Sequence, residues 1–384
     1  MSEGLDIFKL TPQSNCKECG YPTCMSFSFA ASNNPQILCK CPFLVCPENN
    51  EAKNTNPSIN LGISIEKTGI WFSICRGGHI EDINISGYDT TSFANLTIEQ
   101  LSRIQNEVYY TLRKMDVDEN SLRSVVVSYP VDFNIKQIAD VRKLFSKFNL
   151  DVSRYIDHGV ARGLYALSKN RSMCGNACFV DFEKHGTEIS CIYMGDEYVE
   201  AVQNAYIPSD TTQPEMVKVM TEIISSCEDA PILFYRDQDS HAKEIIISIR
   251  DLFSSTELID EHYVSRGALI QANILTGDQD LLVMEQFTDA IYCEIDGDDP
   301  IEVLAPNSII PVRRTLEAET ITPDWTEIVL YAVNNCTKKQ VCIFKSTLPA
   351  FCENRTIDVT VDINPGKTAI INITTNNAQV QLTF

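Results

Sequence analysis

The chain has 384 residues with 52 acidic and 31 basic side chains, and its formal net charge of −21 argues against unaided binding to nucleic acid or to an anionic membrane surface. Its first residues, MSEGLDIFKLTPQSN, have neither the basic start nor the apolar core of a signal peptide, and no apolar run reaches the roughly 18 residues needed to span a bilayer. Fifteen cysteines in such a chain favour the reducing cytoplasm over a secreted disulfide scaffold, so we expect a cytoplasmic protein with no nucleic-acid or membrane partner.

Composition divides the chain into four parts. Residues 1–46 are rich in cysteine, and residues 47–58 are polar with two prolines, as expected of an exposed linker. Strand-like and helix-like patterns alternate over residues 59–279, and strand-like patterns dominate residues 280–384. We therefore predict a multidomain α/β plus β protein, with a small N-terminal domain, an α/β core and a C-terminal antiparallel β-sandwich.

The N-terminal cysteines have the spacing of a cluster site. Cys16, Cys19, Cys24 and Cys41 give C-x2-C-x4-C-x16-C, and Pro42 follows the last of them. A close trio with a distant fourth thiolate fits a cubane iron–sulfur cluster, in which a loop wraps three irons and a later residue completes the site.

The residues around these cysteines also fit a cluster. Gly20 has no side chain and would allow the backbone to approach inorganic sulfide. The stretch CMSFSFAASNN predicts a short helix. Its apolar residues would cover the metal: Met25, Phe27, and Phe29 or Ala30.

Two other readings of the cysteines are structural zinc and a disulfide cluster. Zinc sites usually combine two CxxC or histidine pairs, whereas this segment has one CxxC and no nearby histidine. Cys39 and Cys46 lie outside the spacing, and they fit plain thiols, alternative ligands or a second function.

The stretch CKECGYPTCMSFSFAA followed by CPFL resembles the four-iron, four-sulfur domain of the corrinoid iron–sulfur protein's large subunit. A related module occurs in electron-transport subunits of the Rnf type. The resemblance covers roughly the first 45 residues. It implies that Cys16, Cys19, Cys24 and Cys41 hold a 4Fe-4S cluster.

The middle of the chain predicts alternating helices and strands. A helix starts at Thr97 with Gln100 in a capping box, and its apolar face is Leu101, Ile104, Val108, Leu112 and Met115. A buried strand at Val125–Val127 precedes a helix with Ile138, Val141, Leu144 and Phe145 on one face. A short strand from Val152 to Ile156 and a helix from Val160 follow.

These patterns resemble the DnaK-type heat-shock chaperones, whose nucleotide-binding domain has an actin-like ATPase fold. LGISIEKTGIWFSI and ACFVDFEKHGTEISCIYM stand where that family has its two phosphate hairpins. SRGALIQANILTGDQDLLVME resembles the last helix and the interdomain linker, and NSIIPVRRTLEAET the start of the peptide-binding domain. The resemblance covers residues 59–384 and implies a reduced actin-like core followed by a peptide-binding β-sandwich without a lid.

The loops that would hold a nucleotide depart from this family. Phosphate hairpins need glycines, because backbone N–H groups must reach the phosphate oxygens and a side chain at these positions would block them. Ser64, Glu66 and Lys67 stand at the first hairpin. The second keeps Asp181, Gly186 and Thr187 but has Glu183, Lys184 and His185 in place of glycines.

Two further nucleotide loops are also altered. FYRDQD replaces the glycine pair on the adenosine side, and Asp157 is a shortened substitute for the catalytic acid. We therefore predict a pseudo-ATPase that does not bind ATP and is not an enzyme.

The remaining candidates for chemistry predict ordinary roles. None of the five histidines stands in a spacing that pairs it with a nucleophile or a metal. Cys174 and Cys178 have no third ligand nearby, so we expect loop thiols before the Phe179 strand rather than a metal site.

The C-terminal part predicts an antiparallel sandwich. RTIDVTVDIN alternates, with Ile357, Val359, Val361 and Ile363 on one face, and the NPG at Asn364 marks a turn before further strands. Such a sandwich can add an extended peptide as an extra strand, or it can serve only as a packing module.

Together these features favour an iron–sulfur protein whose chaperone-derived body docks a partner protein or an extended peptide, for electron transfer or redox sensing. The first resemblance points to a corrinoid or other low-potential metalloenzyme of anaerobes as that partner. One alternative is an ATP-dependent reductive activator of such an enzyme, supported by the retained Asp181 and Thr187. Another is a chaperone-like scaffold that the cluster only stabilises.

Overall fold

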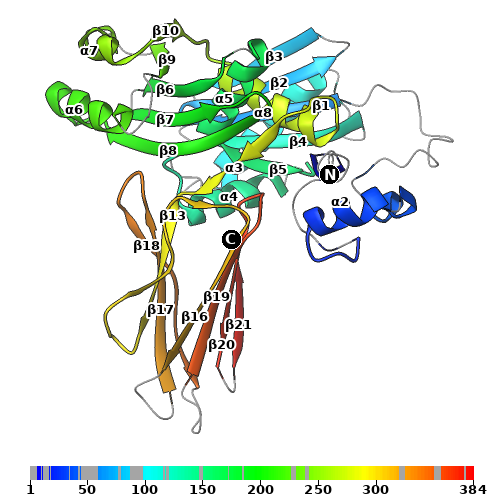
Figure 1. Ribbon diagram of the computed structural model, residues 1–384, viewed down its shortest axis with the longest axis vertical. Coiled ribbons are helices and arrows are strands. Elements are labelled where there is room, and N and C mark those ends of the chain that lie inside the picture. Colours follow the sequence, from blue (N-terminus) through cyan, green and yellow to red (C-terminus); the bar gives the residue numbers. More distant parts are fainter. Residues whose placement is uncertain are drawn as a thin grey trace.

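The structure is a computed structural model, and it shows an N-terminal module, an α/β core and an elongated β-sandwich (Figure 1). It describes residues 7–9, 11, 17, 19–33, 35–41, 44, 59–76, 79–86, 98–115, 117, 121–146, 150–171, 173–183, 186–225, 231–237, 242–319, 325–349, 356–375 and 378–384. The predicted linker at residues 47–58 lies outside this part, as do Cys16, Cys46 and the predicted helix cap Thr97. None of the helices described is long and apolar enough to cross a bilayer.

The N-terminal module contains the predicted short helix. Helix α2 (Cys24–Asn33) is followed by the 3-10 helix η1 (Pro35–Lys40). Thr23 Oγ1 accepts a hydrogen bond from the Ser26 backbone N at 3.0 Å, and Ser26 Oγ accepts one from the Thr23 N at 3.2 Å. This reciprocal pair satisfies free donors at the start of the helix and begins α2 at Cys24.

The core contains the same strand order twice. The first sheet runs β3-β2-β1-β4-β5 and the second runs β8-β7-β6-β9-β10, with β11 added beside β8. In each sheet, the three strands that come first along the chain form an antiparallel meander. The next strand along the chain pairs parallel to the first strand of the meander, and the last strand pairs parallel to that one. This duplicated order is the topology of an actin-like ATPase core, so the predicted fold class is confirmed.

The strands of the two core sheets have the following bounds. They are β1 (Ile59–Glu66), β2 (Gly69–Arg76), β3 (His79–Ser86), β4 (Leu122–Tyr129), β5 (Arg154–Asp157), β6 (Gly175–Glu183), β7 (Gly186–Met194), β8 (Tyr198–Pro208), β9 (Ile232–Asp237), β10 (Ser255–Leu258) and β11 (Leu282–Met284).

Helices fill the space between the sheets and cover their outer faces. They are α3 (Ile98–Lys114), α4 (Ile135–Ser146), α5 (His158–Lys169), α6 (Gln213–Ile224), α7 (Ala242–Ile249), the 3-10 helix η5 (Arg250–Leu252) and α8 (Tyr263–Leu275). Helix α8 packs on the first sheet, α5 on the second, and α5 and α8 pack on each other. Helices α3 and α4 share a hydrophobic cluster with the first sheet, and α6 and α7 share one with the second.

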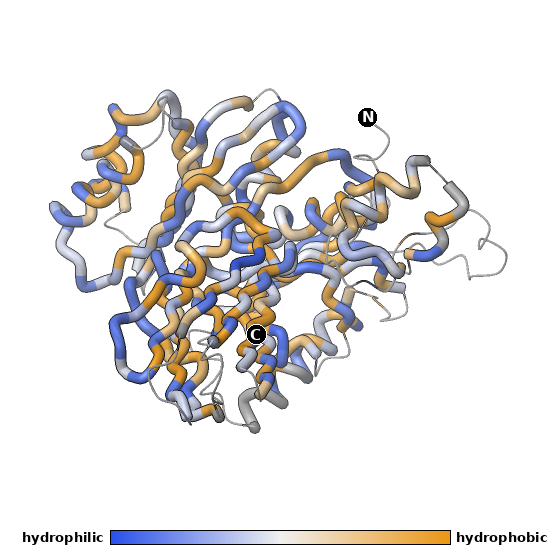
Figure 2. The backbone as a smooth tube through the Cα atoms, turned by 60° about the horizontal axis from the view of Figure 1, so that its bottom comes forward, coloured by the Kyte–Doolittle hydropathy of each residue, from blue (hydrophilic) through white to orange (hydrophobic). Residues whose placement is uncertain are grey.

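A glycine allows the close crossing of the two central helices. A Cβ on Gly267 of α8 would lie 1.8 Å from the Ala161 carbonyl oxygen of α5. No side chain fits at that distance, so the layer between the sheets depends on this residue. Figure 2 shows hydrophobic and hydrophilic residues interspersed along the chain.

Two local predictions in the core need correction. Strand β5 begins at Arg154 rather than Val152, and α5 begins at His158 rather than Val160. The Asp157 carboxylate accepts a hydrogen bond from the Val160 N at 2.9 Å, so it caps the helix that starts directly after it. On α3, the side chain of Leu101 lies outside the described part, and the other predicted inner residues are buried: Ile104, Val108, Leu112 and Met115.

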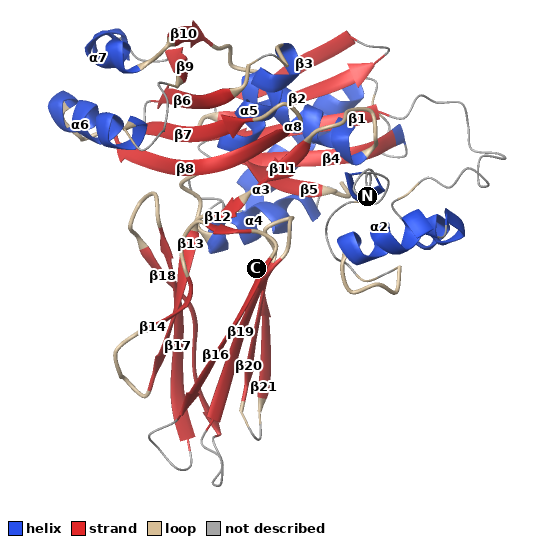
Figure 3. Cartoon of the chain, viewed as in Figure 1, coloured by secondary structure: helices blue, strands red, loops and turns tan. Residues whose placement is uncertain are grey.

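The C-terminal sandwich pairs two four-stranded sheets, β14-β13-β17-β18 and β16-β19-β20-β21 (Figure 3). Its strands are β12 (Gln286–Phe287), β13 (Asp289–Ile295), β14 (Ile301–Leu304), β15 (Ser308–Ile309), β16 (Val312–Glu319), β17 (Trp325–Asn334), β18 (Gln340–Pro349), β19 (Thr356–Ile363), β20 (Ala369–Thr374) and β21 (Gln379–Thr383). The predicted alternation of β19 is confirmed, because Ile357, Val359, Val361 and Ile363 are all buried between the sheets.

The sandwich is joined to the core by apolar and polar contacts. The Ile135 side chain at the start of α4 belongs to the hydrophobic cluster of the sandwich. Its backbone N donates a hydrogen bond to Asp289 Oδ2 at 2.8 Å, and Asn334 donates one to Asp289 Oδ1 at 2.8 Å. Between these domains Leu281 is buried, and β11 pairs with β8 from Leu282 onwards, so the connecting segment is part of the core sheet.

Candidate functional site

Three of the four predicted cluster ligands lie in the described part of the N-terminal module. Cys24 is buried at the first residue of α2, where the positive end of the helix dipole favours a thiolate. Cys41 is buried just after η1, and Cys19 is half-buried in the turn before α2. Cys16 lies outside the described residues, and so does the side chain of Cys39.

An apolar shell surrounds these thiols. Phe27 and Ala31 of α2 form a small cluster with Cys41, and Cys19 and Tyr21 pack against it. The rings of Tyr21 and Phe27 meet edge to face at 5.6 Å. Soft sulfur donors in a shell that limits water fit an iron–sulfur cluster.

The predicted cover of the metal is only partly right. Phe27 is fully buried, whereas Met25 and Phe29 are 37% and 43% exposed and are not among the residues of the thiols' apolar cluster. The approach of the Gly20 backbone to sulfide stays a prediction. Gly20 has a φ of +81°, which favours glycine by itself, and an added Cβ would meet no protein atom within 4 Å.

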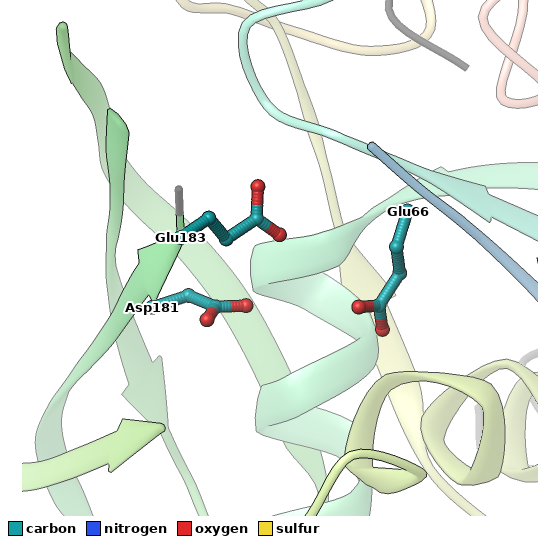
Figure 4. Close-up of side chains that lie close together, drawn as sticks. All are labelled: Glu66, Asp181 and Glu183. Carbon is teal, nitrogen blue, oxygen red and sulfur yellow. The ribbon is translucent and has the colours of Figure 1, made fainter. Parts of the chain in front are cut away.

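A second constellation lies between the two core sheets, where the phosphate hairpins were predicted. Glu66 ends β1, and Asp181 and Glu183 lie on β6. The three buried carboxyl groups come within 4.8 Å of one another, and Figure 4 shows the Glu66 carboxylate facing those of β6. Three carboxylates so close together need a counter-charge.

Arg236 of β9 supplies that counter-charge. It pairs with Glu66 Oε2 at 2.7 Å, donates from Nε to Asp181 Oδ1 at 2.8 Å, and reaches Glu183 Oε1 at 3.3 Å. Strand β9 runs beside β6 with Arg236 directly opposite Asp181. One guanidinium therefore joins the end of the first sheet to the second sheet.

Arg162 of α5 extends the network. It donates to Asp181 Oδ2 at 3.0 Å and to Glu188 Oε1 at 2.8 Å. The other Glu188 oxygen lies 3.3 Å from His158 Nδ1, and His158 Nε2 lies 3.3 Å from Ser64 Oγ. This serine, histidine and glutamate have the order of a hydrolytic triad, but all three are buried and a substrate could not reach them.

The pKa values follow from burial and from these partners. Burial and the charge of Asp181 raise the pKa of Glu66 and that of Glu183, even though Arg236 acts in the opposite direction. Burial alone would raise the pKa of Glu188, but Arg162 and His158 hold it well below its usual range. The cluster therefore has more carboxylates than guanidinium groups and retains protons most readily at Glu66 and Glu183.

Lys67, in the turn of the first hairpin, is also buried and engaged. Its Nζ lies 3.1 Å from Asp132 Oδ2 and 3.5 Å from the centroid of the Tyr206 ring. Burial lowers the pKa of Lys67, but Asp132 and its other neighbours raise it overall. The lysine is therefore held as a cation inside the protein.

The residues that the family would use for nucleotide have structural partners here. Thr187 contacts Met216 Sδ at 3.8 Å and is buried. An added Cβ on Gly186 would lie 2.5 Å from the Ile207 carbonyl oxygen, which accounts for this glycine without a phosphate. Asp157 caps α5 and pairs with Lys367 of the sandwich at 2.6 Å.

The ion-pair network therefore stabilises the site rather than leaving it open. The guanidinium groups of Arg162 and Arg236 already lie on carboxylates, whereas a phosphate needs free donors. The trio Glu66, Asp181 and Glu183 has the oxygen donors of a hard-metal site, but Arg236 contacts all three.

Sequence reasoning missed several members of this network. Arg162, Glu188, Arg236 and Lys367 were not singled out, and His158 was expected to have no such partner. A charged residue inside an otherwise apolar element, as in GVARGLYAL or PILFYRD, was the available signal. Cys178 was expected in a loop, but it lies buried within β6 while Cys174 is exposed.

Comparisons with known proteins agree with the N-terminal prediction. Residues 12–43 match the family described as "Putative Fe-S cluster". The N-terminal segment is therefore similar to iron–sulfur modules. The chain is 40% identical over 68 residues to the acetyl-CoA decarbonylase/synthase complex subunit gamma of Methanocaldococcus jannaschii, and 42% identical over 41 residues to the corrinoid/iron-sulfur protein large subunit of Moorella thermoacetica.

These two matches are local. They cover 18% and 11% of this chain, and 13% and 9% of the two relatives. The chain therefore shares only a small part of the length of the curated relatives that it matches.

Solved structures similar to the body have very low sequence identity. They include a Bacteroides thetaiotaomicron protein with an actin-like ATPase fold and unknown function (TM-score 0.37, 9% identity, 56% of this chain and 95% of that one). A second is the ethanolamine utilization protein EutJ from Carboxydothermus hydrogenoformans, with a TM-score of 0.40 and 10% identity over 65% of this chain and 98% of that one. A third is an inorganic polyphosphate/ATP-glucomannokinase from Arthrobacter sp. strain KM, with a TM-score of 0.39 and 14% identity over 57% of this chain and 99% of that one. The fold assignment rests on the duplicated strand order and not on these scores.

Proposed function

We propose that this chain is an iron–sulfur protein whose body docks a partner and does not turn over nucleotide. The observation that carries the proposal is the pair of buried guanidinium groups, Arg162 and Arg236, bonded to carboxylates between the two hairpins. An ATPase needs that space for phosphates and a metal ion. Here the protein's own charges occupy it.

The proposed cofactor is a 4Fe-4S cluster held by Cys16, Cys19, Cys24 and Cys41. Such a cluster supplies one electron at a time, and its potential depends on the shell around it. The residues of this chain would bind it, and Phe27 and Ala31 would limit the access of water. A redox-sensing role uses the same residues.

The proposed partner is a corrinoid or other low-potential metalloenzyme in the cytoplasm of an anaerobe. The relatives named above support this class, because one is a subunit of a synthase complex and the other is part of a corrinoid/iron-sulfur protein. We further infer that the body derives from a DnaK-type chaperone. Its sandwich would contact the partner or an extended peptide segment.

The proposed division of the chain follows the functions. Residues 1–46 would form the cluster domain and residues 47–58 a tether. Residues 59–279 would form the pseudo-ATPase core, and residues 280–384 the docking sandwich. A reductive activator driven by ATP has less support, because Asp181 is bound by two arginines and Thr187 is buried against Met216.

The cluster is tested by anaerobic purification with iron and sulfide analysis. We expect about four irons and four sulfides per chain and a paramagnetic signal on reduction. Replacing any of the four cysteines by serine should reduce the iron content, whereas Cys39→Ser and Cys46→Ser are matched controls that should retain it. Stoichiometric zinc without iron would contradict the proposal.

The absence of ATPase function is tested separately by calorimetry with Mg-ATP and Mg-ADP. We expect no binding tighter than about millimolar, which corresponds to about 4 kcal/mol. A micromolar dissociation constant would instead support the reductive activator, whatever the outcome of the iron analysis.

A further inference from the structure

The N-terminal module contacts the body of the protein at the connector, which is the segment of residues 276–281 between α8 and β11. Lys9 Nζ lies 3.0 Å from Asp280 Oδ1. The Lys9 side chain is only 14% exposed although its partner is 70% exposed, so the lysine stem lies against protein while the carboxylate stays open to solvent. Figure 1 shows the start of the chain close to the junction of the core and the sandwich.

A short N-terminal segment, residues 7–9 and 11, links this contact to the cysteines. Ile7 packs against the apolar cluster that surrounds the predicted ligands. Thr11 is fully buried, and its backbone N and its Oγ1 both donate to the Phe8 carbonyl oxygen, at 3.1 and 2.7 Å. The segment comes before residues 12–43, which match the iron–sulfur family. It is therefore an addition to the matched module that touches both the module and, through Lys9, the body.

The connector has two carboxylates, and they have different partners. Asp278 is held within the core, because it accepts a hydrogen bond from Asn60 Nδ2 at 3.1 Å and pairs with Arg123 at 3.2 Å. Asp280 pairs instead with Lys9 of the module, and Lys9 is its cation among the described residues. The carboxylate that the core does not use is thus the one that the module contacts.

The residues directly after Asp280 fasten the connector to the core. Leu281 is buried, and the Leu282 N donates a hydrogen bond to the Glu197 carbonyl oxygen at 2.7 Å, where β11 joins β8. Lys9 therefore binds the last exposed position before the chain enters the core sheet on its way to the sandwich. A contact at this position bears on the segment that joins the two domains.

Charge and connectivity favour this contact. Residues 1–46 contain three lysines and three acidic residues and are neutral, whereas the rest of the chain carries the net charge of −21. A lysine of the module therefore meets an acidic body, which is a complementary arrangement. A partly exposed ion pair is weak by itself. The predicted linker of residues 47–58 ties the module to the core, however, so docking is intramolecular and needs little affinity.

We propose that the N-terminal segment seats the module on the connector through the ion pair of Lys9 and Asp280. The module is then held at the junction of the core and the sandwich and does not move freely on its linker. The inference deepens the proposed function and rests on it in one respect: the cluster would lie where a partner bound to the sandwich can exchange electrons with it. The seat itself does not require iron.

The test is cross-linking of the full chain with a carbodiimide, which joins an amine to a carboxylate only when the two are in contact. We expect an intramolecular link between Lys9 and Asp280, identified by mass spectrometry. Its yield should be comparable with that of the link between Lys345 and Glu327, an ion pair within the sandwich that serves as the internal control. Iron analysis of the same sample keeps the two proposals apart. A link without iron contradicts only the cluster, and iron without the link contradicts only the seat.

Variants test whether this ion pair is responsible. Lys9→Glu combined with Asp280→Lys should restore the link that either change alone abolishes, because opposite charges meet again in reversed order. Lys9→Gln should raise the rate of proteolytic cutting between Gly277 and Gln286 about two- to fivefold, the effect expected of one partly exposed ion pair. Lys40→Gln removes an exposed charge of the same module and is the matched control, so it should change neither the link nor the rate of cutting.

Two results would overturn the proposal. One is a Lys9 amine that links to many carboxylates of the body with no preference for Asp280, which would show that the module moves freely. The other is a double charge reversal that fails to restore the link while the control pair in the sandwich still reacts. Because Asp280 is largely exposed, these changes leave the packing of the core in place.

Discussion

Replacing Arg236 by Met tests whether the ion-pair network holds the core together. The change keeps an unbranched apolar stem and removes the guanidinium group whose charge faces Glu66, Asp181 and Glu183. Removing one partner of a buried ion pair costs about 3–5 kcal/mol, because the remaining charges stay buried without compensation. That is a large part of the roughly 5–15 kcal/mol by which a domain is stable.

The loss should depend on pH in a defined direction. Burial already raises the folded-state pKa values of Glu66 and Glu183, and loss of Arg236 would raise them further. The folded state then holds protons that the unfolded state releases, so stability falls as the pH rises above the unfolded pKa of about 4.3. The difference between Arg236→Met and the unchanged protein should therefore be greater at pH 8 than at pH 5.

The assay is urea unfolding followed by circular dichroism at these two pH values. Adding Glu183→Gln to Arg236→Met should recover part of the loss, since one uncompensated carboxylate is then removed. Arg103→Met, at an exposed pair with Glu107, should cost less than about 0.5 kcal/mol and serves as the control. A loss below about 1 kcal/mol, or one that is equal at both pH values, would refute the reasoning.

Three further predictions concern packing, protonation and domain contact; in the first, Gly267→Ala should lower stability by about 3 kcal/mol or more in urea unfolding, because its Cβ would overlap the Ala161 carbonyl oxygen. Gly366→Ala is the control, since its Cβ would lie 3.4 Å from the nearest atom, and it should cost less than about 1 kcal/mol. Similar losses for the two variants would contradict the close crossing of the helices. Burial raises the pKa of Asp289 from 3.8 to about 6, so its contribution to stability falls by about 2 kcal/mol as the pH rises from 4 to 6. Asp289→Asn should flatten that part of the pH profile, and an unchanged profile would count against it. Limited proteolysis should cut first between Pro47 and Asn60 and leave a fragment from near Ile59 to Phe384, because β11 is paired with β8 and Leu281 is buried; early cutting between Gly277 and Gln286 would show that the domains separate.

The sequence was sufficient for elements with a clear period. The alternation of β19 and the buried face of α3 follow from local spacing, and both are confirmed. The boundary between β5 and α5 was less accurate, because Asp157 caps the helix and its role as a cap was not considered. Local patterns fix the type of an element better than its ends.

The candidate sites differ in how far the sequence could predict them. The spacing of four cysteines within 26 residues predicts a cluster site, and the family match over residues 12–43 agrees with an iron–sulfur module there. The ion-pair network could not be read in this way. Its pairs join residues as far apart as Glu66 and Arg236, and only the fold brings them together.

The same network bears on how the protein could be regulated. In an ATPase of this fold, the nucleotide lies between the two hairpins and its turnover changes how the halves of the core meet. Here Arg236 joins Glu66 of the first sheet to Asp181 and Glu183 of the second, and under the proposed function this side chain takes the place of an exchangeable ligand. A ligand shifts the equilibrium between two conformations only through its different affinities for them, and a side chain of the protein itself is not exchanged for another ligand. Lys367 extends this rigidity to the sandwich through its pair with Asp157 at 2.6 Å. Under the proposed function, regulation of the body would act outside this network, for example at the N-terminal module, where Lys9 contacts Asp280 beside the connecting strand at 3.0 Å.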